Sequence, residues 1–323
     1  MIEILSNSAL NTIQDRGRPQ AMTLGVARGG AMDLLALACG NMLLGNEPDA
    51  AGIEIAFFPF RLRFLDDRAF AVTGARGSAR LDGVELPPDW AMIARAGQTL
   101  QCDAPTEGCR TYVTIAGGID VPLVLGARAT DLKGGFGGLE GRALQKGDRL
   151  PCGAPAMPGI PPYGYGLAGR CPLPDADATR VRVLAAAEYD DFTVEARRAF
   201  FHTAWRLTPS ANRMGYRLEG APLTQQRPLN LFSHGIVPGT VQVPPAGQPI
   251  VQMADANTCG GYPKIATIIE PDLRLLAQTR VNGNIRFIET TPADALAALR
   301  AEARDQARRA DAFADLRRML MPA

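Results

Sequence analysis

The chain has 323 residues, of which 46% are hydrophobic, so it can form one large or two medium domains with a full core. Its formal net charge is +1, so we expect no basic patch for binding DNA or RNA. The longest apolar run is far shorter than the ~20 residues of a membrane helix, and the N-terminus has no basic segment typical of a signal peptide. We therefore expect a cytoplasmic protein that binds neither nucleic acid nor membrane.

Short alternating stretches predict a mainly β protein with few helices. Residues 60–64 are apolar at every second position, which is the period of a strand. Residues 79–86 predict a hairpin, because Asp82 and Gly83 at its tip both tolerate positive φ. Further strands are expected at 69–73, 110–116, 180–185, 240–243, 249–253, 265–269 and 285–288.

Three helices are expected. The first is capped by Asp33, runs to about Leu44 and ends at Gly45. The second covers about 191–201. The last starts with Thr291 as its N-cap and Pro292 at its first position, and continues to about Leu320.

Seven prolines in 151–179 predict a linker, or a long connecting loop, between two β lobes. The expected division is an N-terminal β lobe with one short helix at 1–175, a C-terminal β lobe at 176–291 and a C-terminal helix at 292–321.

Several motifs do not support a site of their own. Residues 164–169 read Gly-x-Gly-x-x-Gly, but prolines surround them, so no strand and helix enclose the motif as a dinucleotide site requires. Glycines at 134–138 are not followed by the lysine of a P-loop, and predict either a flexible turn or an active-site loop. No Cys-x-x-Cys pair is present and His202 and His234 are the only histidines, so no metal site is expected.

Polar residues close to glycines form a first candidate cluster, since such loops present backbone and side chains together to a ligand. Asn41 lies on the apolar face of its helix and is expected to brace the loop that follows. Asp33 could serve only as a helix cap, and Asp15 only as a partner of Arg16 or Arg18. The members of this cluster are Gln14, Asp15, Asp33, Asn41 and Glu54. In a second cluster, at 116–148, Arg128 is a candidate binder of carboxylate or phosphate.

The third cluster is the richest and surrounds a Gly-Gly turn. A carboxylate, a hydroxyl, backbone N–H groups and a lysine are the groups that can polarise an amide carbonyl. Lys264 is one of only three lysines in the chain, which favours a site over an ordinary surface position. His234 could equally be a structural histidine. The candidates are Asn212, Arg213, His234, Asp255, Thr258, Gly260, Gly261, Tyr262 and Lys264.

Together these segments resemble the allophanate hydrolase subunit 2 family, also called the biotin-dependent carboxyltransferase family, which includes 5-oxoprolinase C subunits, KipI antagonists and part of urea carboxylase. The resemblance covers about residues 3–290. The matching segments are Thr12-Ile-Gln-Asp-Arg-Gly-Arg18, Gly30-Ala-Met-Asp33, Thr73-Gly-Ala75, Ala116-Gly-Gly-Ile-Asp120, Ser210-Ala-Asn-Arg-Met-Gly-Tyr-Arg217, Gly239-Thr-Val-Gln-Val-Pro-Pro245 and residues 255–263.

The resemblance implies two cyclophilin-like β-barrel lobes and a heteromer with a subunit-1-type protein. It assigns the substrate site to Asp255, Thr258, Gly260, Gly261, Tyr262 and Lys264. This chain departs from the family where Asn257, Gly29 and two alanines (Ala127 and Ala129) stand in place of common glutamine and serine residues, which leaves the substrate open.

Three functions follow from the resemblance. The first is a subunit of an ATP-dependent 5-oxoprolinase, with ATP and nucleotide binding at the level of a complex that includes a larger ATP-using subunit. The second is a carboxyltransferase subunit acting on urea or a similar amide, with biotin on a separate partner. The third is a non-catalytic regulatory protein that binds its partner.

Overall fold

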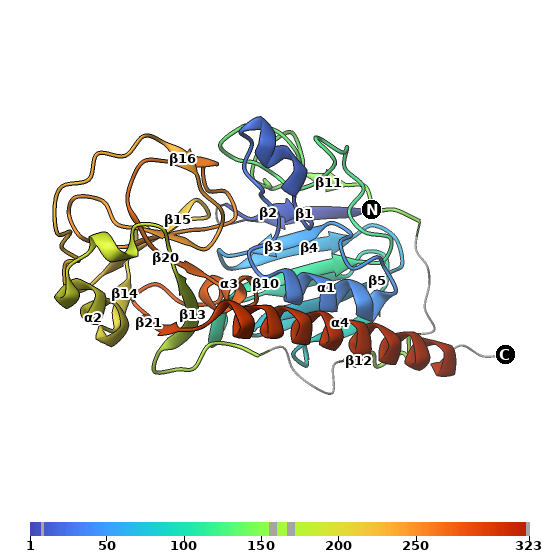
Figure 1. Cartoon of the computed structure of the whole chain (residues 1–323). Coiled ribbons are helices and arrows are strands. Elements are labelled where there is room, and N and C mark those ends of the chain that lie inside the picture. Colours follow the sequence, from blue (N-terminus) through green and yellow to red (C-terminus); the bar gives the residue numbers. More distant parts are fainter. Residues whose placement is uncertain (8–9, 155–159, 167–171, 321–323) are drawn as a thin grey trace. The chain divides into compact units, whose positions relative to one another are not determined.

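The computed structural model describes residues 1–7, 10–154, 160–166 and 172–320 (Figure 1). The chain forms two compact units. The first unit is Met1–Arg18, Gly29–Leu173 and Asp305–Ala323, and the second is Pro19–Arg28 and Pro174–Arg304. Neither unit is one continuous block of sequence, because 19–28 belongs to the second unit and the last helix contributes to both.

The first unit contains two antiparallel six-stranded sheets. One sheet has the order β11 (Arg149–Leu150), β1 (Ile2–Ser6), β4 (Phe60–Phe64), β9 (Thr99–Cys102), β6 (Ala79–Leu81) and β7 (Val84–Leu86). The other has the order β12 (Tyr165–Gly166), β8 (Trp90–Ala94), β5 (Arg68–Arg76), β10 (Glu107–Ile115), β3 (Gly52–Ile55) and β2 (Thr12–Gln14).

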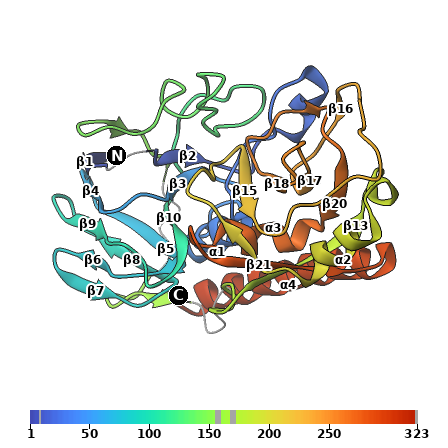
Figure 2. The same cartoon turned by 90° about the vertical axis from the view of Figure 1, so that its left-hand side faces the viewer.

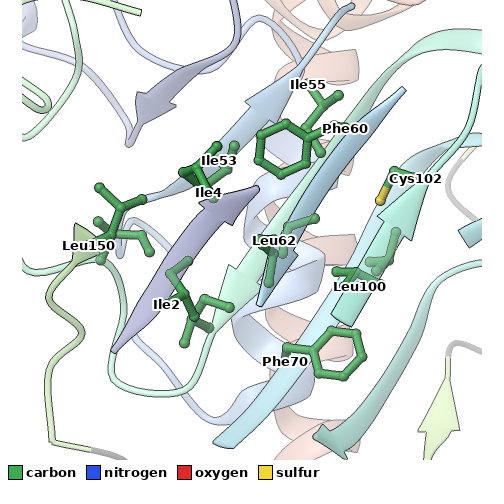
Figure 3. Close-up of a cluster of buried hydrophobic side chains, with 14 of the residues drawn as sticks. Ile2, Ile4, Ile53, Ile55, Phe60, Leu62, Phe70, Leu100, Cys102 and Leu150 are labelled. Atoms are coloured by element: carbon green, nitrogen blue, oxygen red, sulfur yellow. The ribbon is translucent and has the colours of Figure 1, made fainter. Parts of the chain in front are cut away.

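Side-chain alternation explains how these sheets form one core (Figure 3). In β4 the side chains of Phe60, Leu62 and Phe64 are fully buried, while the two arginines between them are exposed. Phe70 from β5 joins the same cluster, so the two sheets enclose it between them. Ala69 and Ala71 point to the opposite face of β5, where they pack with the first helix.

That helix, α1 (Leu34–Leu44), is positioned by its caps. The Asp33 carboxylate accepts a hydrogen bond of 3.1 Å from the amide of Ala36. Gly45 ends the helix in the left-handed region at φ 73°. In the first unit, α4 (Pro292–Leu320) covers α1 through Phe313, and Arg317 donates a hydrogen bond to the carbonyl of Met42 near the end of α1.

The second unit is built on a closed seven-stranded barrel (Figure 2). A parallel pairing of β13 with β21, in register at Thr179 and Ile285, closes it. Helix α2 (Val194–His202) packs on the barrel, where Phe200 stacks on Phe287 with ring centroids 4.3 Å apart. The barrel order is β13 (Thr179–Ala185), β20 (Lys264–Ile268), β17 (Thr240–Gln242), β18 (Ile250–Gln252), β15 (Gly215–Glu219), β14 (Trp205–Leu207) and β21 (Asn284–Glu289).

Smaller elements complete the second unit. These are the 3-10 helices at Pro19–Leu24 and Tyr189–Asp191, helix α3 (Glu270–Ala277), and a two-stranded sheet of β16 (His234–Gly235) and β19 (Cys259–Gly260). Arg28 pairs with Glu270 at 3.0 Å, and so ties the segment 19–28 to α3.

The mainly β fold with few helices and a long C-terminal helix is confirmed. The expected strands, the 79–86 hairpin and the three helices are all present, with ends that differ by up to three residues. A closed barrel occurs in the second unit, whereas the strands of the first form two open sheets around one core. The likeness to cyclophilin barrels stays a prediction.

Several elements were not expected, including strands β1, β3, β8 and β9, helix α3 and part of the proline-rich segment. Helix α3 begins after Ile269, whose side chain cannot cap it, so the usual N-cap signal is absent. Part of the proline-rich segment 151–179 is also ordered against the first unit. There β12 pairs with β8, and Tyr165 donates to the carbonyl of Leu43. Of the Gly-x-Gly-x-x-Gly motif, residues 167–169 lie outside the described part of the chain.

Within the described ranges, no helix is both long and apolar enough to cross a membrane.

Candidate functional site

A short sheet in the second unit organises the candidate site. His234 in β16 pairs with Gly260 in β19, and Gly235 pairs with Cys259. The sheet continues through a 2.9 Å hydrogen bond from the amide of Ile236 to the carbonyl of Thr258. The Gly-Gly turn is followed in the chain by Lys264, which begins the barrel strand β20.

Lys264 has a charged and a basic neighbour. Its ammonium nitrogen lies 3.6 Å from the Oε2 atom of Glu188, and contacts Nε2 of His234. The side chains of Lys264 and Glu188 are only 15% and 13% exposed. His234 is fixed at its other ring nitrogen, because Nδ1 lies 2.9 Å from the carbonyl oxygen of Phe232.

Arg213 and Asp255 form a bidentate ion pair. Both hydrogen bonds, from Nε to Oδ2 and from a terminal guanidinium nitrogen to Oδ1, measure 2.8 Å. The side chains are 12% and 8% exposed, so water screens the pair poorly. The amide of Asp255 also donates to the carbonyl of Arg213 at 2.9 Å. Asn212 shapes the adjoining turn, since its side-chain oxygen accepts from the amide of Met214 at 2.8 Å.

Two glutamines hold the Gly-Gly-Tyr segment. Gln252 donates to the side-chain oxygen of Gln242 at 3.0 Å, and Gln242 donates to the carbonyl of Tyr262 at 3.3 Å. Gly260 leaves room for this chain, because a Cβ there would lie 2.6 Å from Nε2 of Gln242. Tyr262 is 47% exposed and so remains accessible to a ligand.

The candidates of the first unit fall into two groups, of which the first surrounds Glu54. Oε2 of this carboxylate accepts from the hydroxyl of Tyr112 at 2.7 Å and from the amide of Met32 at 2.8 Å. The Tyr112 hydroxyl in turn accepts from the amide of Asp33 at 2.8 Å. Burial, with the nearby charges of Glu54 and Asp33, raises the pKa of Tyr112 well above its usual value. These hydrogen bonds therefore hold the start of α1 against strands β3 and β10.

The second group links the loop after β2 to residues 128–130. The carboxylate of Asp15 accepts from the amides of Gly17 and Arg128, and Gln14 donates to the carbonyl of Thr130 at 3.2 Å. Burial raises the pKa of Asp15 in spite of these bonds. The guanidinium of Arg128 pairs with Asp120 at 3.0 Å.

Asn41 braces the loop after α1, as expected. Its amide nitrogen donates to the carbonyls of Ala50 at 2.7 Å and Pro48 at 3.3 Å. Its oxygen accepts from Asn46 at 3.0 Å. Asp33 likewise has the capping role that was one of its two interpretations.

The described residues do not form a nucleotide cradle around the glycine-rich segment 134–138. A Cβ at Gly137 would overlap the carbonyl of Ala129, and one at Gly138 would overlap the side chain of Thr130. These two glycines therefore serve close packing of the chain on itself, and the amides of Gly134, Gly135 and Gly138 donate to Asp131 and Arg128 instead of facing a phosphate. Nor do the described residues hold a cluster of three or more His, Cys, Asp or Glu side chains suited to a metal ion.

Sequence reasoning missed Glu188 and the two glutamines. Glu188 follows the end of β13, and β13 pairs with β20, so the pairing brings it to Lys264. An acidic residue just after a predicted strand does not by itself indicate a site. Its proximity to Lys264 follows only from the order of the strands in the barrel.

The comparisons with known proteins identify the class of this fold. The model of the carboxyltransferase domain, subdomains A and B, matches residues 24–289. The chain therefore belongs to the carboxyltransferase domain family.

Among curated proteins, two similar relatives are both named as the C subunit of 5-oxoprolinase. The protein from Escherichia coli is 42% identical over 92% of this chain and 94% of its own length. The protein from Haemophilus influenzae is 41% identical over 89% and 90%, respectively. The crystal structure of Kluyveromyces lactis urea carboxylase is also similar, with a TM-score of 0.87 and 26% identity over 97% of this chain. This chain spans only 29% of that larger protein.

Proposed function

We propose that the chain is a subunit of an ATP-dependent 5-oxoprolinase, which opens the lactam of 5-oxoproline to give glutamate. The observation that carries this proposal is the length of the match. Two proteins named as the C subunit of 5-oxoprolinase are at least 41% identical along nearly their whole length. A putative urea carboxylase of Emericella nidulans is 30% identical, and the chain spans only 25% of it.

The site suggests how this chain would contribute to lactam opening. Hydrolysis adds water at the carbonyl carbon and breaks its bond to nitrogen, and negative charge develops on the carbonyl oxygen. The Lys264 ammonium would stabilise that charge, as an oxyanion-hole donor does. Asp255 has both oxygens engaged by Arg213, so we assign it to positioning the loop that carries Thr258 and the Gly-Gly turn.

ATP would be used elsewhere in the complex, because the amides of Gly134, Gly135 and Gly138 are already engaged within the chain. The proposal therefore needs a larger ATP-using subunit, and a subunit-1-type protein as the direct partner. The names of the two relatives, which call them subunits, support such a complex.

Carboxyl transfer to urea or a similar amide is the second candidate, and the family match favours it. In that reaction Lys264 would hold the carboxyl group, and biotin would be carried by a separate partner. Asp255 would have to leave Arg213 before it could take the amide proton.

The test is to reconstitute the chain with the subunit-1-type and larger subunits of its own genome, and to measure release of glutamate from 5-oxoproline. Urea with a biotinylated carrier is the competing substrate. Glutamate release that requires ATP and all three proteins supports the hydrolase. A stable complex that releases none, but carboxylates urea, would replace it with the second candidate.

A further inference from the structure

The Glu188 carboxylate lies close to both the backbone amide and the side-chain ammonium of Lys264. Pairing of β13 with β20 continues beyond the strand, through a 3.1 Å bond from the amide of Ala186 to the carbonyl of Ile265. Glu188 then accepts a 2.9 Å hydrogen bond from the backbone amide of Lys264. The same oxygen, Oε2, lies 3.6 Å from the ammonium nitrogen. One carboxylate oxygen therefore holds the start of β20 and faces its charged group.

The neighbours of His234 determine which ring nitrogen carries the proton. Nδ1 lies 2.9 Å from the carbonyl oxygen of Phe232, and a carbonyl can only accept, so Nδ1 carries hydrogen. In the neutral ring Nε2 is then an acceptor. The Lys264 ammonium, which has only donors, is therefore the donor in its contact with Nε2.

We infer that Glu188 and His234 are positioning residues that fix the direction of the Lys264 ammonium and leave one of its N–H groups for a substrate oxygen. An ammonium carries three N–H donors. Among the described residues, His234 takes one and Glu188 faces a second. The third would then point at a single acceptor, which suits the carbonyl oxygen of an amide or one carboxylate oxygen.

The two partners also differ in what they supply. Glu188 places an opposite charge 3.6 Å from the ammonium nitrogen, whereas His234 provides a directed acceptor at Nε2. A catalytic role for the oriented Lys264 ammonium rests on the proposed function. The contacts of Lys264 with Glu188 and His234 do not depend on that function. These contacts can therefore be tested without an activity assay.

The first arm of the test measures how fast each lysine reacts with acetic anhydride, by mass spectrometry of the full chain. Exposed Lys133 and Lys146 serve as internal references. Glu188→Gln keeps the size of the side chain and an oxygen for the backbone bond, but removes the charge. We expect Lys264 to react roughly tenfold faster in this variant, because its nitrogen is no longer held against the carboxylate. The matched control is Glu195→Gln, which changes an exposed residue of α2.

The second arm is nitrogen-15 NMR of the two histidines in the unaltered chain and in Lys264→Met. His202 is the internal reference, since its Nδ1 also lies near a carbonyl, that of Arg198, at 2.8 Å. Both rings should carry the proton on Nδ1, and Lys264→Met should shift only the Nε2 resonance of His234. A proton on Nε2 of His234, an Nε2 resonance that does not move, or an unchanged Lys264 reactivity in Glu188→Gln would overturn the inference.

These outcomes are separate from the fate of the proposed function. A 5-oxoprolinase assay that fails, while both arms succeed, would leave Glu188 and His234 as positioning residues in a different reaction. If Glu188→Gln does not fold, the NMR arm still decides on His234 and Lys264.

Discussion

Arg213 binds Asp255 through two parallel hydrogen bonds of 2.8 Å, and both side chains are nearly buried. This pair connects the turn before β15 with the loop that leads to the Gly-Gly turn. Its geometry is the bidentate fork that guanidinium and carboxylate form best. The pair therefore links the fold of the barrel to the shape of the candidate site.

We predict that Asp255→Ala lowers the free energy of unfolding by about 3 kcal/mol, since it removes the carboxylate from a poorly hydrated guanidinium. Unfolding of the barrel can be followed by the fluorescence of buried Trp205 in a Trp90→Phe background, because the chain has only these two tryptophans. Arg213→Ala should behave similarly, and the double variant should cost less than the sum of the two. The exposed pair of Arg180 and Asp175 is the control, with an expected loss below about 1 kcal/mol. Strictly additive losses at Arg213 and Asp255 would contradict the prediction.

Gly260→Ala should disturb the site while the barrel stays folded. Its new methyl group would press on the side chain of Gln242, which supports the carbonyl of Tyr262. We expect activity of the reconstituted complex to fall by about tenfold or more, since small misplacements at a site are costly. Gly235→Ala lies in the same short sheet, and its methyl group would meet nothing within 4 Å. Equal effects of the two variants would count against this role of Gly260.

Asn41→Ala should destabilise the first unit by about 1–3 kcal/mol, because two carbonyls of the following loop lose their buried donor. Trp90 fluorescence in a Trp205→Phe background would measure the change. Gln145→Ala, at an exposed position of the same unit, should stay within about 0.5 kcal/mol. A loss no larger than that of the control would show that the loop is held by other contacts.

Asp148 should make the first unit more sensitive to acid. Burial opposes its charge, but two hydrogen bonds from Arg142 and one from the amide of Gln145 hold its pKa below the usual value. The folded state therefore gains stability above the unfolded pKa of about 3.9, and loses it as the pH falls through the lower folded pKa. Asp148→Asn should flatten the decline in unfolding free energy between about pH 5 and pH 2.

Asp15 should affect the pH dependence of stability in the direction opposite to Asp148. Burial raises its pKa, so its contribution is greatest below the unfolded pKa and is lost as the pH rises through the folded value. The difference in stability between the unaltered chain and Asp15→Asn should therefore move with pH in the direction opposite to that for Asp148→Asn. Parallel shifts in both variants would refute this assignment.

Helices and hairpins with a capping or turn residue at their ends could be predicted from the sequence. Asp33 and Gly45 mark both ends of α1, and Asp82-Gly83 marks the β6–β7 hairpin. Helix α3 has a proline and two acidic residues in its first turn, but its N-cap Ile269 makes no side-chain cap and the helix has only eight residues. Strand β12 has two residues and exists through its pairing with β8.

In the candidate site, too, the residues could be predicted from local sequence but their contacts could not. Lys264, His234, Asp255 and Arg213 could be nominated from their residue types and from the motifs around them. The pairing of Arg213 with Asp255, and the approach of Glu188 to Lys264, depend on which strands are neighbours in the barrel. Strand order is a property of the whole chain, so no single segment could predict these contacts.

The central claim, that Lys264 stabilises the reacting oxygen, is tested most directly by glutamate release from 5-oxoproline in the reconstituted complex. Lys264→Met should lower the rate at least about 100-fold, as loss of an oxyanion donor does. Lys146→Met, which removes an exposed lysine, should keep the full rate. A Lys264→Met complex that assembles and turns over as fast as the Lys146→Met complex would contradict the account.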